Sequence, residues 1–163
     1  GTKIYENPNA KELLYVPERT KRMKRFTDIY DKYESYRLDT TAYVDREGSR
    51  LGGVQTDVHV SSYENDSVTA EIVSDGDTYV CFSQNYSPHW SAEVDGVEQK
   101  VDMVNGLIMG IEIPEGKHTV VFTYRDRSYE AGAAVTGVTV IVLAGGILIG
   151  RRRRKRQKQT GMK

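Results

Sequence analysis

The spacing of apolar residues changes twice along the chain. In residues 20–38 apolar side chains recur every three or four positions, which is helical spacing along one face. These positions are Met23, Phe26, Ile29, Tyr30, Tyr33 and Tyr36. The pattern predicts one amphipathic helix, roughly residues 20–36, packed on a larger domain.

From about residue 55 the spacing shortens to two, the alternation of a strand with one buried face. Such runs cover residues 58–60, 68–72, 80–82, 90–94, 107–113 and 118–124, and short strands are expected earlier at residues 3–10 and 13–16. Asp95-Gly96 and Asn105-Gly106 are dipeptides that favour tight hairpins. The pattern predicts a mainly β fold, an antiparallel, jelly-roll-like β-sandwich with one N-terminal amphipathic helix.

Residues 131–150 form a third kind of stretch, because twenty successive residues carry no charge. At 1.5 Å per residue a helix of this length spans roughly 30 Å, the thickness of the hydrocarbon core of a bilayer. The stretch predicts a single C-terminal transmembrane helix. The alternative is the core helix of a much larger domain, which would leave the cations that follow it unexplained.

Charge is segregated, although the formal net charge of the chain is zero. Eight of the 23 basic side chains lie in residues 151–163, which leaves 15 basic and 23 acidic side chains, a net charge of −8, in residues 1–150. Six cations follow the apolar stretch directly: Arg151, Arg152, Arg153, Arg154, Lys155 and Arg156. The positive-inside rule predicts a cytoplasmic tail, with anionic lipid as its partner, and an extracytoplasmic position for residues 1–130. A membrane anchor explains the tail without nucleic acid.

The sequence therefore predicts three parts: an extracytoplasmic β-sandwich domain (residues 1–130), a transmembrane helix (131–150) and a basic cytoplasmic tail (151–163). Cys81 is the one cysteine, so no intrachain disulfide forms, and a bacterial surface domain fits better than a disulfide-stapled secreted one. The first residues lack the apolar core of a signal peptide. We expect the chain to be a fragment whose upstream part places the domain outside the cell.

Several motifs resemble one family. Residues 86–96 read Tyr-Ser-Pro-His-Trp-Ser-Ala-Glu-Val-Asp-Gly, similar to the Y-x-P-G-W-x-A-x-V-D-G signature near the C-terminus of YfhO-type bacterial membrane proteins. Further motifs follow in the family's order at residues 105–106, 114–118 and 122–124, and residues 5–10 (Tyr-Glu-Asn-Pro-Asn-Ala) precede them. The resemblance covers residues 4–151 and is densest at 86–124.

The resemblance implies the C-terminal extracytoplasmic domain and last membrane helix of a large multi-pass protein related to C-type glycosyltransferases. Those enzymes use polyprenyl-phosphate-linked sugars to decorate cell-envelope polymers such as lipoteichoic acid. Their catalytic carboxylates lie in an early loop that no part of this chain matches. By resemblance, the parent protein is a glycosyltransferase, its upstream membrane helices are partners of this domain, and the chain alone is not an enzyme and holds no catalytic residue.

Three neighbouring residues are the candidate glycan contacts. Trp90 beside Tyr86 and His89 offers an aromatic platform that stacks on a sugar ring. Trp90 shares the inward phase of Ala92 and Val94, so a core position is its alternative. Tyr86 and His89, off that phase, are the better contacts.

Other chemistry-bearing residues predict no site. The acidic turn residues lack the six to eight converging oxygens of a calcium site, and the three histidines lack metal-ligand spacing. Cys81 has no His or Asp partner nearby in sequence and reads as a small buried residue. The sequence therefore predicts neither a metal nor a cofactor.

Two functions remain open at this point. The first is a non-catalytic accessory domain of a membrane glycosyltransferase that acts in lipoteichoic acid-type polymer glycosylation. The second is a single-pass, membrane-anchored adhesion or protein-interaction module. An anionic polymer would need a basic patch on the acidic domain, and the candidates are Lys21, Arg22, Lys24 and Arg25, for which a solvated helix face is the alternative.

Overall fold

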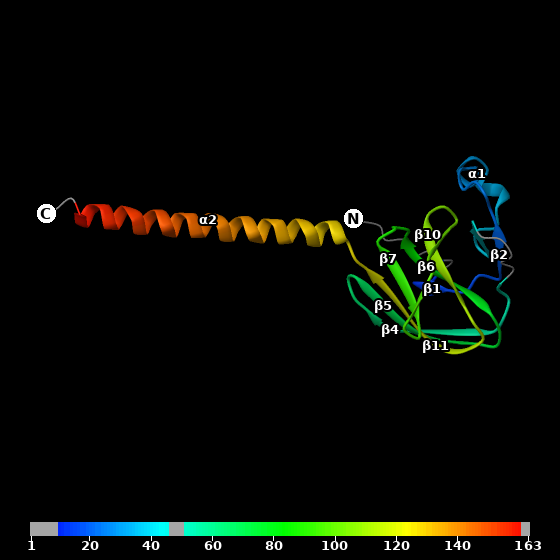
Figure 1. The fold of residues 1–163 in the computed structure, drawn as a ribbon. Coiled ribbons are helices and arrows are strands. Elements are labelled where there is room, and N and C mark those ends of the chain that lie inside the picture. Colours follow the sequence, from blue (N-terminus) through cyan, green and yellow to red (C-terminus); the bar gives the residue numbers. More distant parts are fainter. Residues whose placement is uncertain (1–9, 46–50, 161–163) are drawn as a thin grey trace, which may run out of the picture. The chain divides into compact units, whose positions relative to one another are not determined.

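The computed structural model describes residues 10–45 and 51–160, with side chains up to residue 147 (Figure 1). The chain forms two compact units, one up to Arg125 and the other from Asp126 onward. We call the first unit the β-domain. The second unit contains one long helix, α2 (Arg127–Thr160). The strand expected at residues 3–10 lies outside the described residues.

Two sheets make up the β-domain. The strands of the first are, in spatial order, β1 (Leu14–Tyr15), β6 (Thr78–Asn85), β10 (Ile108–Ile113), β9 (Asp102–Val104), β3 (Thr41–Val44) and β2 (Arg19–Arg22). Those of the second are β4 (Thr56–Tyr63), β5 (Ser67–Ser74), β11 (Gly116–Tyr124), β7 (Trp90–Val94) and β8 (Val97–Gln99). Among the described strands every pairing is antiparallel except that of β2 with β3.

The main core lies between the two sheets. In β5 the side chains of Val68, Ala70 and Ile72 are buried, because alternate residues of a strand point to the same face. Phe82 in β6 and Phe122 in β11, one from each sheet, meet there with ring centroids 4.9 Å apart. This packing confirms the predicted antiparallel β-sandwich.

The two predicted hairpin turns are present. Asp95-Gly96 joins β7 to β8, and Asn105-Gly106 lies in the connection from β9 to β10. All four residues have positive φ, between +53° and +79°. A type I′ turn requires this conformation at both central positions, and Asp, Asn and Gly adopt it most readily.

The predicted helix over residues 20–36 is wrong in its first part. Residues 19–22 form the edge strand β2, and the chain becomes helical only at α1 (Thr27–Asp31), followed by the 3-10 turn η1 (Tyr33–Ser35). The amide of Thr20 donates to the carbonyl of Leu51 at 2.8 Å, and its hydroxyl accepts from the Leu51 amide at 3.0 Å. These long-range bonds outweigh the local helical spacing.

The second unit confirms the predicted membrane helix. Residues 127–147 are long and apolar enough to cross a bilayer, and the helix begins before the charge-free stretch. The hydroxyls of Thr136 and Thr139 donate to the carbonyls of Gly132 and Val135, both at 2.9 Å, so they are satisfied within the helix. The backbone stays helical through Arg151, Arg152, Arg153, Arg154, Lys155 and Arg156. That this tail is cytoplasmic and binds anionic lipid stays a prediction.

Candidate functional site

The predicted glycan contacts lie where β7 begins beside the end of β11. Trp90 pairs with Tyr124 in the ladder of these two strands. The amide of Trp90 donates to the carbonyl of Ser87 at 3.1 Å, and the amide of Arg125 donates to the carbonyl of His89 at 3.0 Å. A tight turn before β7 therefore sets the backbone of His89 and Trp90 against the last residues of the β-domain.

The rings of this region form a connected group. Trp90 meets Phe82 and Tyr124 edge to face, with centroids 5.3 Å and 5.4 Å apart, and the His89 ring lies 5.8 Å from that of Tyr124. Tyr86 and Trp90 are half-buried and pack against the main core. The structure thus brings His89 and Trp90 together on Tyr124, a partner that sequence reasoning did not name. Contact of Tyr86, His89 and Trp90 with a glycan stays a prediction.

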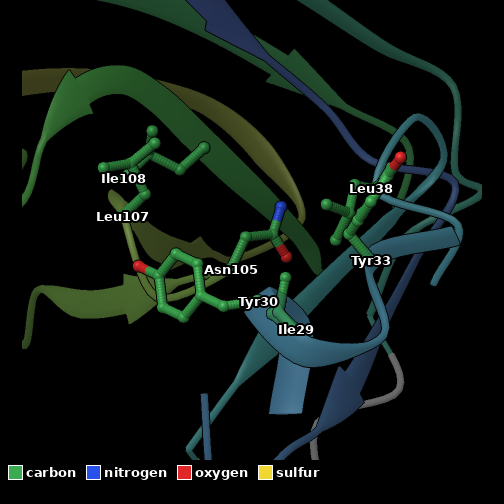
Figure 2. A pocket seen from close by; sticks show the side chains of 7 residues that line it. All are labelled: Ile29, Tyr30, Tyr33, Leu38, Asn105, Leu107 and Ile108. Carbon is green, nitrogen blue, oxygen red and sulfur yellow. The ribbon is translucent and has the colours of Figure 1, made fainter. Parts of the chain in front are cut away.

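A pocket elsewhere in the β-domain was missed from the sequence. A pocket of about 420 Å³ opens between the α1–η1 segment and the turn that precedes β10 (Figure 2). It is lined by Ile29, Tyr30, Tyr33, Leu38, Asn105, Leu107 and Ile108. The sequence predicted each side of the pocket separately, one as the apolar face of a helix and the other as a hairpin turn. Nothing local in the sequence joins them.

The turn side of the pocket is held firmly. Asn105 exchanges two hydrogen bonds with Tyr43: its amide donates to the Tyr43 carbonyl, and its Oδ1 accepts from the Tyr43 amide, both at 2.9 Å. The Tyr30 hydroxyl donates to the carbonyl of Gly106 at 3.1 Å and so ties α1 to the same turn. Ile29, on the inner side of α1, is buried with Met23 and Tyr43 in a small separate core. These contacts preform the pocket.

The rim of the pocket is apolar and open to water. Tyr30, Tyr33 and Leu107 are 63%, 64% and 56% exposed, although all three are large hydrophobic side chains. None of the seven lining residues is charged. Exposed apolar side chains gathered around a cavity are typical of a binding surface.

The predicted basic patch does not lie on a helix face. Lys21 and Arg22 belong to the edge strand β2, whereas Lys24 and Arg25 lie in the connection to α1. The guanidinium of Arg25 is 3.7 Å from the carboxylate of Asp28, an exposed pair. An exposed pair of this kind contributes at most about 1 kcal/mol to stability.

A thiol and a tyrosine hydroxyl, groups that often take part in catalysis, are held in their neutral forms here. Cys81 is fully buried in β6, and burial raises the pKa of its thiol to about 12. Burial also raises the pKa of the neighbouring Tyr15 hydroxyl. Among the described residues no group of three or more His, Cys, Asp or Glu side chains is placed to hold a metal ion.

Comparison with curated proteins and with solved structures finds no match. Comparison with protein families finds a match. The matched residues, 30–136, run from the end of α1 through strands β3 to β11 and into the apolar part of α2, so they cover well over half of the chain. The apolar helix and this match agree on a membrane location. The chain belongs to the family described as bacterial membrane protein YfhO, a membrane-associated family related to glycosyltransferases.

Proposed function

We propose that the β-domain is a non-catalytic, extracytoplasmic accessory domain of a multi-pass membrane glycosyltransferase-like protein. Its parent would act in the glycosylation of a cell-envelope polymer of the lipoteichoic acid type. The domain would help hold the acceptor glycan near the membrane, with Tyr86 and His89 as contacts and Trp90 as their support.

One observation carries the proposal. The family match runs without a break from the β-domain into the membrane-spanning part of α2. Only Arg125 and Asp126 separate the last strand from the helix. A domain joined so closely to a membrane helix works at the bilayer surface, where lipid-linked sugars and their polymer acceptors are found.

The residues around Trp90 support a contact role. The rings of His89 and Tyr124 lie at an edge-to-face angle beside Trp90 and are only partly buried, so they offer both apolar faces and polar atoms. Cys81, the one nucleophilic thiol, is buried and protonated, which favours a role in packing.

A complementation experiment tests the proposal. The gene is deleted, and the parent protein is restored as wild type, as the double variant Tyr86→Ala with His89→Ala, or as Tyr63→Ala, an exposed tyrosine outside the aromatic group. The sugar content of the lipoteichoic acid is then measured. We expect deletion to lower it, wild type and Tyr63→Ala to restore it, and the double variant to restore it only in part at equal protein level.

Two outcomes would contradict the proposal. If deletion leaves the sugar content unchanged, the parent does not glycosylate this polymer, and the alternative of an adhesion or protein-interaction module gains support. If the double variant restores sugar content fully, the domain does not hold the acceptor through these residues.

A further inference from the structure

We propose that the pocket beside α1 binds one acyl chain of a glycerolipid, whose ester carbonyl accepts a hydrogen bond from the side-chain amide of Asn105. This inference goes beyond the accessory role proposed above and does not depend on it. It rests on the lining of the pocket, on one donor in its wall, and on the place of the pocket in the β-domain.

The lining selects an apolar ligand. Apart from Asn105, every lining residue is aliphatic or tyrosine. A sugar ring buried here would bring several hydroxyl groups, each of which costs free energy when it finds no partner. A free phosphate or carboxylate would find no cation, because no lining side chain is charged. A hydrocarbon chain needs neither a hydrogen-bond partner nor a cation, and its transfer from water into the pocket is favourable in free energy.

Three lining side chains carry a polar group. The hydroxyls of Tyr30 and Tyr33 already donate to the Gly106 carbonyl and the Glu34 carboxylate. The third, the side-chain amide of Asn105, has a defined direction. The amide of Tyr43 is a donor, so the side-chain oxygen of Asn105 must face it. The Asn105 NH₂ group therefore points the other way, and it has no acceptor among the described residues. Figure 2 shows Asn105 among the rim side chains, with Tyr30 and Leu107 around it. This neutral donor, in a wall otherwise made of aliphatic and tyrosine side chains, matches one neutral carbonyl on an apolar chain.

The Leu107 side of the rim lies at the end of the β-domain from which the chain continues to the membrane helix. The amide of Tyr86 donates to the carbonyl of Leu107 at 2.8 Å, which joins the rim to the loop before β7. That loop is bonded in turn to Arg125 through His89, at 3.0 Å. The Leu107 side of the pocket rim and the exit of the chain thus belong to the same end of the β-domain.

Membrane lipid is therefore the amphiphile present at the highest local concentration. The chain passes from Tyr124 to the start of α2 over at most about 11 Å. Tethering of this kind turns a weak encounter into an effectively intramolecular one. Exposed tyrosines such as Tyr30 and Tyr33 also suit the boundary between water and the bilayer.

Photo-crosslinking tests the proposal with the full chain. The protein is reconstituted in vesicles of phosphatidylglycerol and phosphatidylcholine that contain a trace of phosphatidylglycerol with a diazirine on one acyl chain. After irradiation and digestion, labelled peptides are identified by mass spectrometry. We expect label on residues 29–38 and 105–108 in addition to α2, which serves as the internal reference.

Asn105→Asp separates the donor from its structural role. An aspartate keeps an oxygen for the Tyr43 amide and tolerates positive φ, but it loses the NH₂ donor. We expect pocket label relative to α2 label to fall roughly 2- to 10-fold, the value of one hydrogen bond. The same probe with ether in place of ester linkages should show that loss with the wild type and no further loss with the variant. If the new charge of the variant instead repelled lipid, pocket label would be lower in the variant than in the wild type with both the ester and the ether probe.

Tyr33→Ala opens the pocket wall and should also lower pocket label, whereas Tyr63→Ala, equally exposed but outside the pocket, should not. The fluorescence of Trp90 checks that each variant is folded. Label on α2 alone, or equal labelling by ester and ether lipids in the wild type, would overturn the proposal. So would loss of pocket label on addition of a soluble oligosaccharide, which would assign the pocket to a glycan.

Discussion

His118 in β11 and Asp95 in the turn after β7 form a close pair, with Nδ1 of the imidazole 2.6 Å from Oδ2 of the carboxylate. The other ring nitrogen, Nε2, lies 3.2 Å from the carbonyl of Glu115. Both nitrogens thus face acceptors, an arrangement that only the doubly protonated ring satisfies. Hydrogen bonding to Asp95 accordingly raises the pKa of His118, and the Thr119 amide and then His118 lower the pKa of Asp95.

This pair predicts a pH dependence with two limits. A histidine whose pKa is raised by folding stabilises the fold below its ordinary pKa of 6.5, and the contribution is lost as pH rises through the folded value. A carboxylate whose pKa is lowered stabilises the fold above its ordinary value of 3.8, and that contribution is lost as pH falls through the folded value. From this pair we expect greatest stability between those two values.

Asp95→Asn isolates the effect. Asn-Gly keeps the turn type, and the side-chain oxygen still accepts from the Thr119 amide, but the charge is gone. We expect the loss of stability as pH rises above 6.5 to be smaller in this variant. Denaturant titrations of the full chain in detergent, followed by the fluorescence of Trp90, measure it. An unchanged slope above pH 6.5 would contradict the assignment to His118.

Gly106 and Gly96 make a matched pair of turn glycines. Both have positive φ, +70° and +79°, so alanine at either costs about 1–2 kcal/mol. A Cβ on Gly106 would also lie 2.9 Å from Cβ of Phe26, whereas one on Gly96 meets nothing within 4 Å. We expect Gly106→Ala to lower the free energy of unfolding by about 1–3 kcal/mol more than Gly96→Ala. Equal losses would mean that Phe26 moves freely.

The contact between the two sheets predicts a large effect at Phe82. This side chain is buried and meets Phe122 and Trp90. Phe82→Ala should lower the free energy of unfolding by about 3–5 kcal/mol, because it removes apolar contacts and leaves a cavity. Tyr63→Ala, at a 67% exposed position, should change it by about 0.5 kcal/mol or less. Denaturation midpoints of the two variants give the comparison.

The thiol of Cys81 should be unreactive in the folded protein. It is fully buried, and its pKa of about 12 leaves almost no thiolate at neutral pH. We expect a thiol reagent to label it at pH 8 only after denaturant is added. Rapid labelling of the native chain would show that β6 opens.

Because Cys81 is unreactive, variants with one added cysteine can report on which side of the membrane each part of the chain lies. Ser62→Cys places a thiol at an exposed position of β4, and Gln157→Cys places one in the basic tail. With a membrane-impermeant maleimide and intact cells, we expect the first to be labelled and the second to be labelled only after permeabilisation. The reverse pattern would place the β-domain in the cytoplasm.

Local signals predicted a large part of the fold. Asp95-Gly96 and Asn105-Gly106 specify hairpins because their turn type depends on two neighbouring φ angles. Alternation predicted one strand of each hairpin, β7 and β10, whereas the short partner strands β8 and β9 were not predicted. The apolar, charge-free stretch likewise predicted a membrane helix, since length and hydropathy are properties of one segment.

Non-local pairing explains what was missed. Residues 20–22 begin a stretch whose apolar spacing is helical, yet Thr20 forms hydrogen bonds with Leu51, 31 positions away. The pocket was missed for the same reason, because Tyr30 meets Gly106 across 76 positions. The aromatic group was anticipated at Trp90 and His89 but not at Tyr124, which reaches them only through the pairing of β7 with β11.

The position of β11 has a mechanical consequence. This strand is central in its sheet, with β5 on one side and β7 on the other, and the chain leaves it for α2 after two residues. A force on the membrane helix directed along β11 would act on its hydrogen bonds to β5 and to β7 at the same time. Many of these bonds would then have to break together. A displacement of the membrane helix would therefore reach the centre of this sheet through a connection of only two residues.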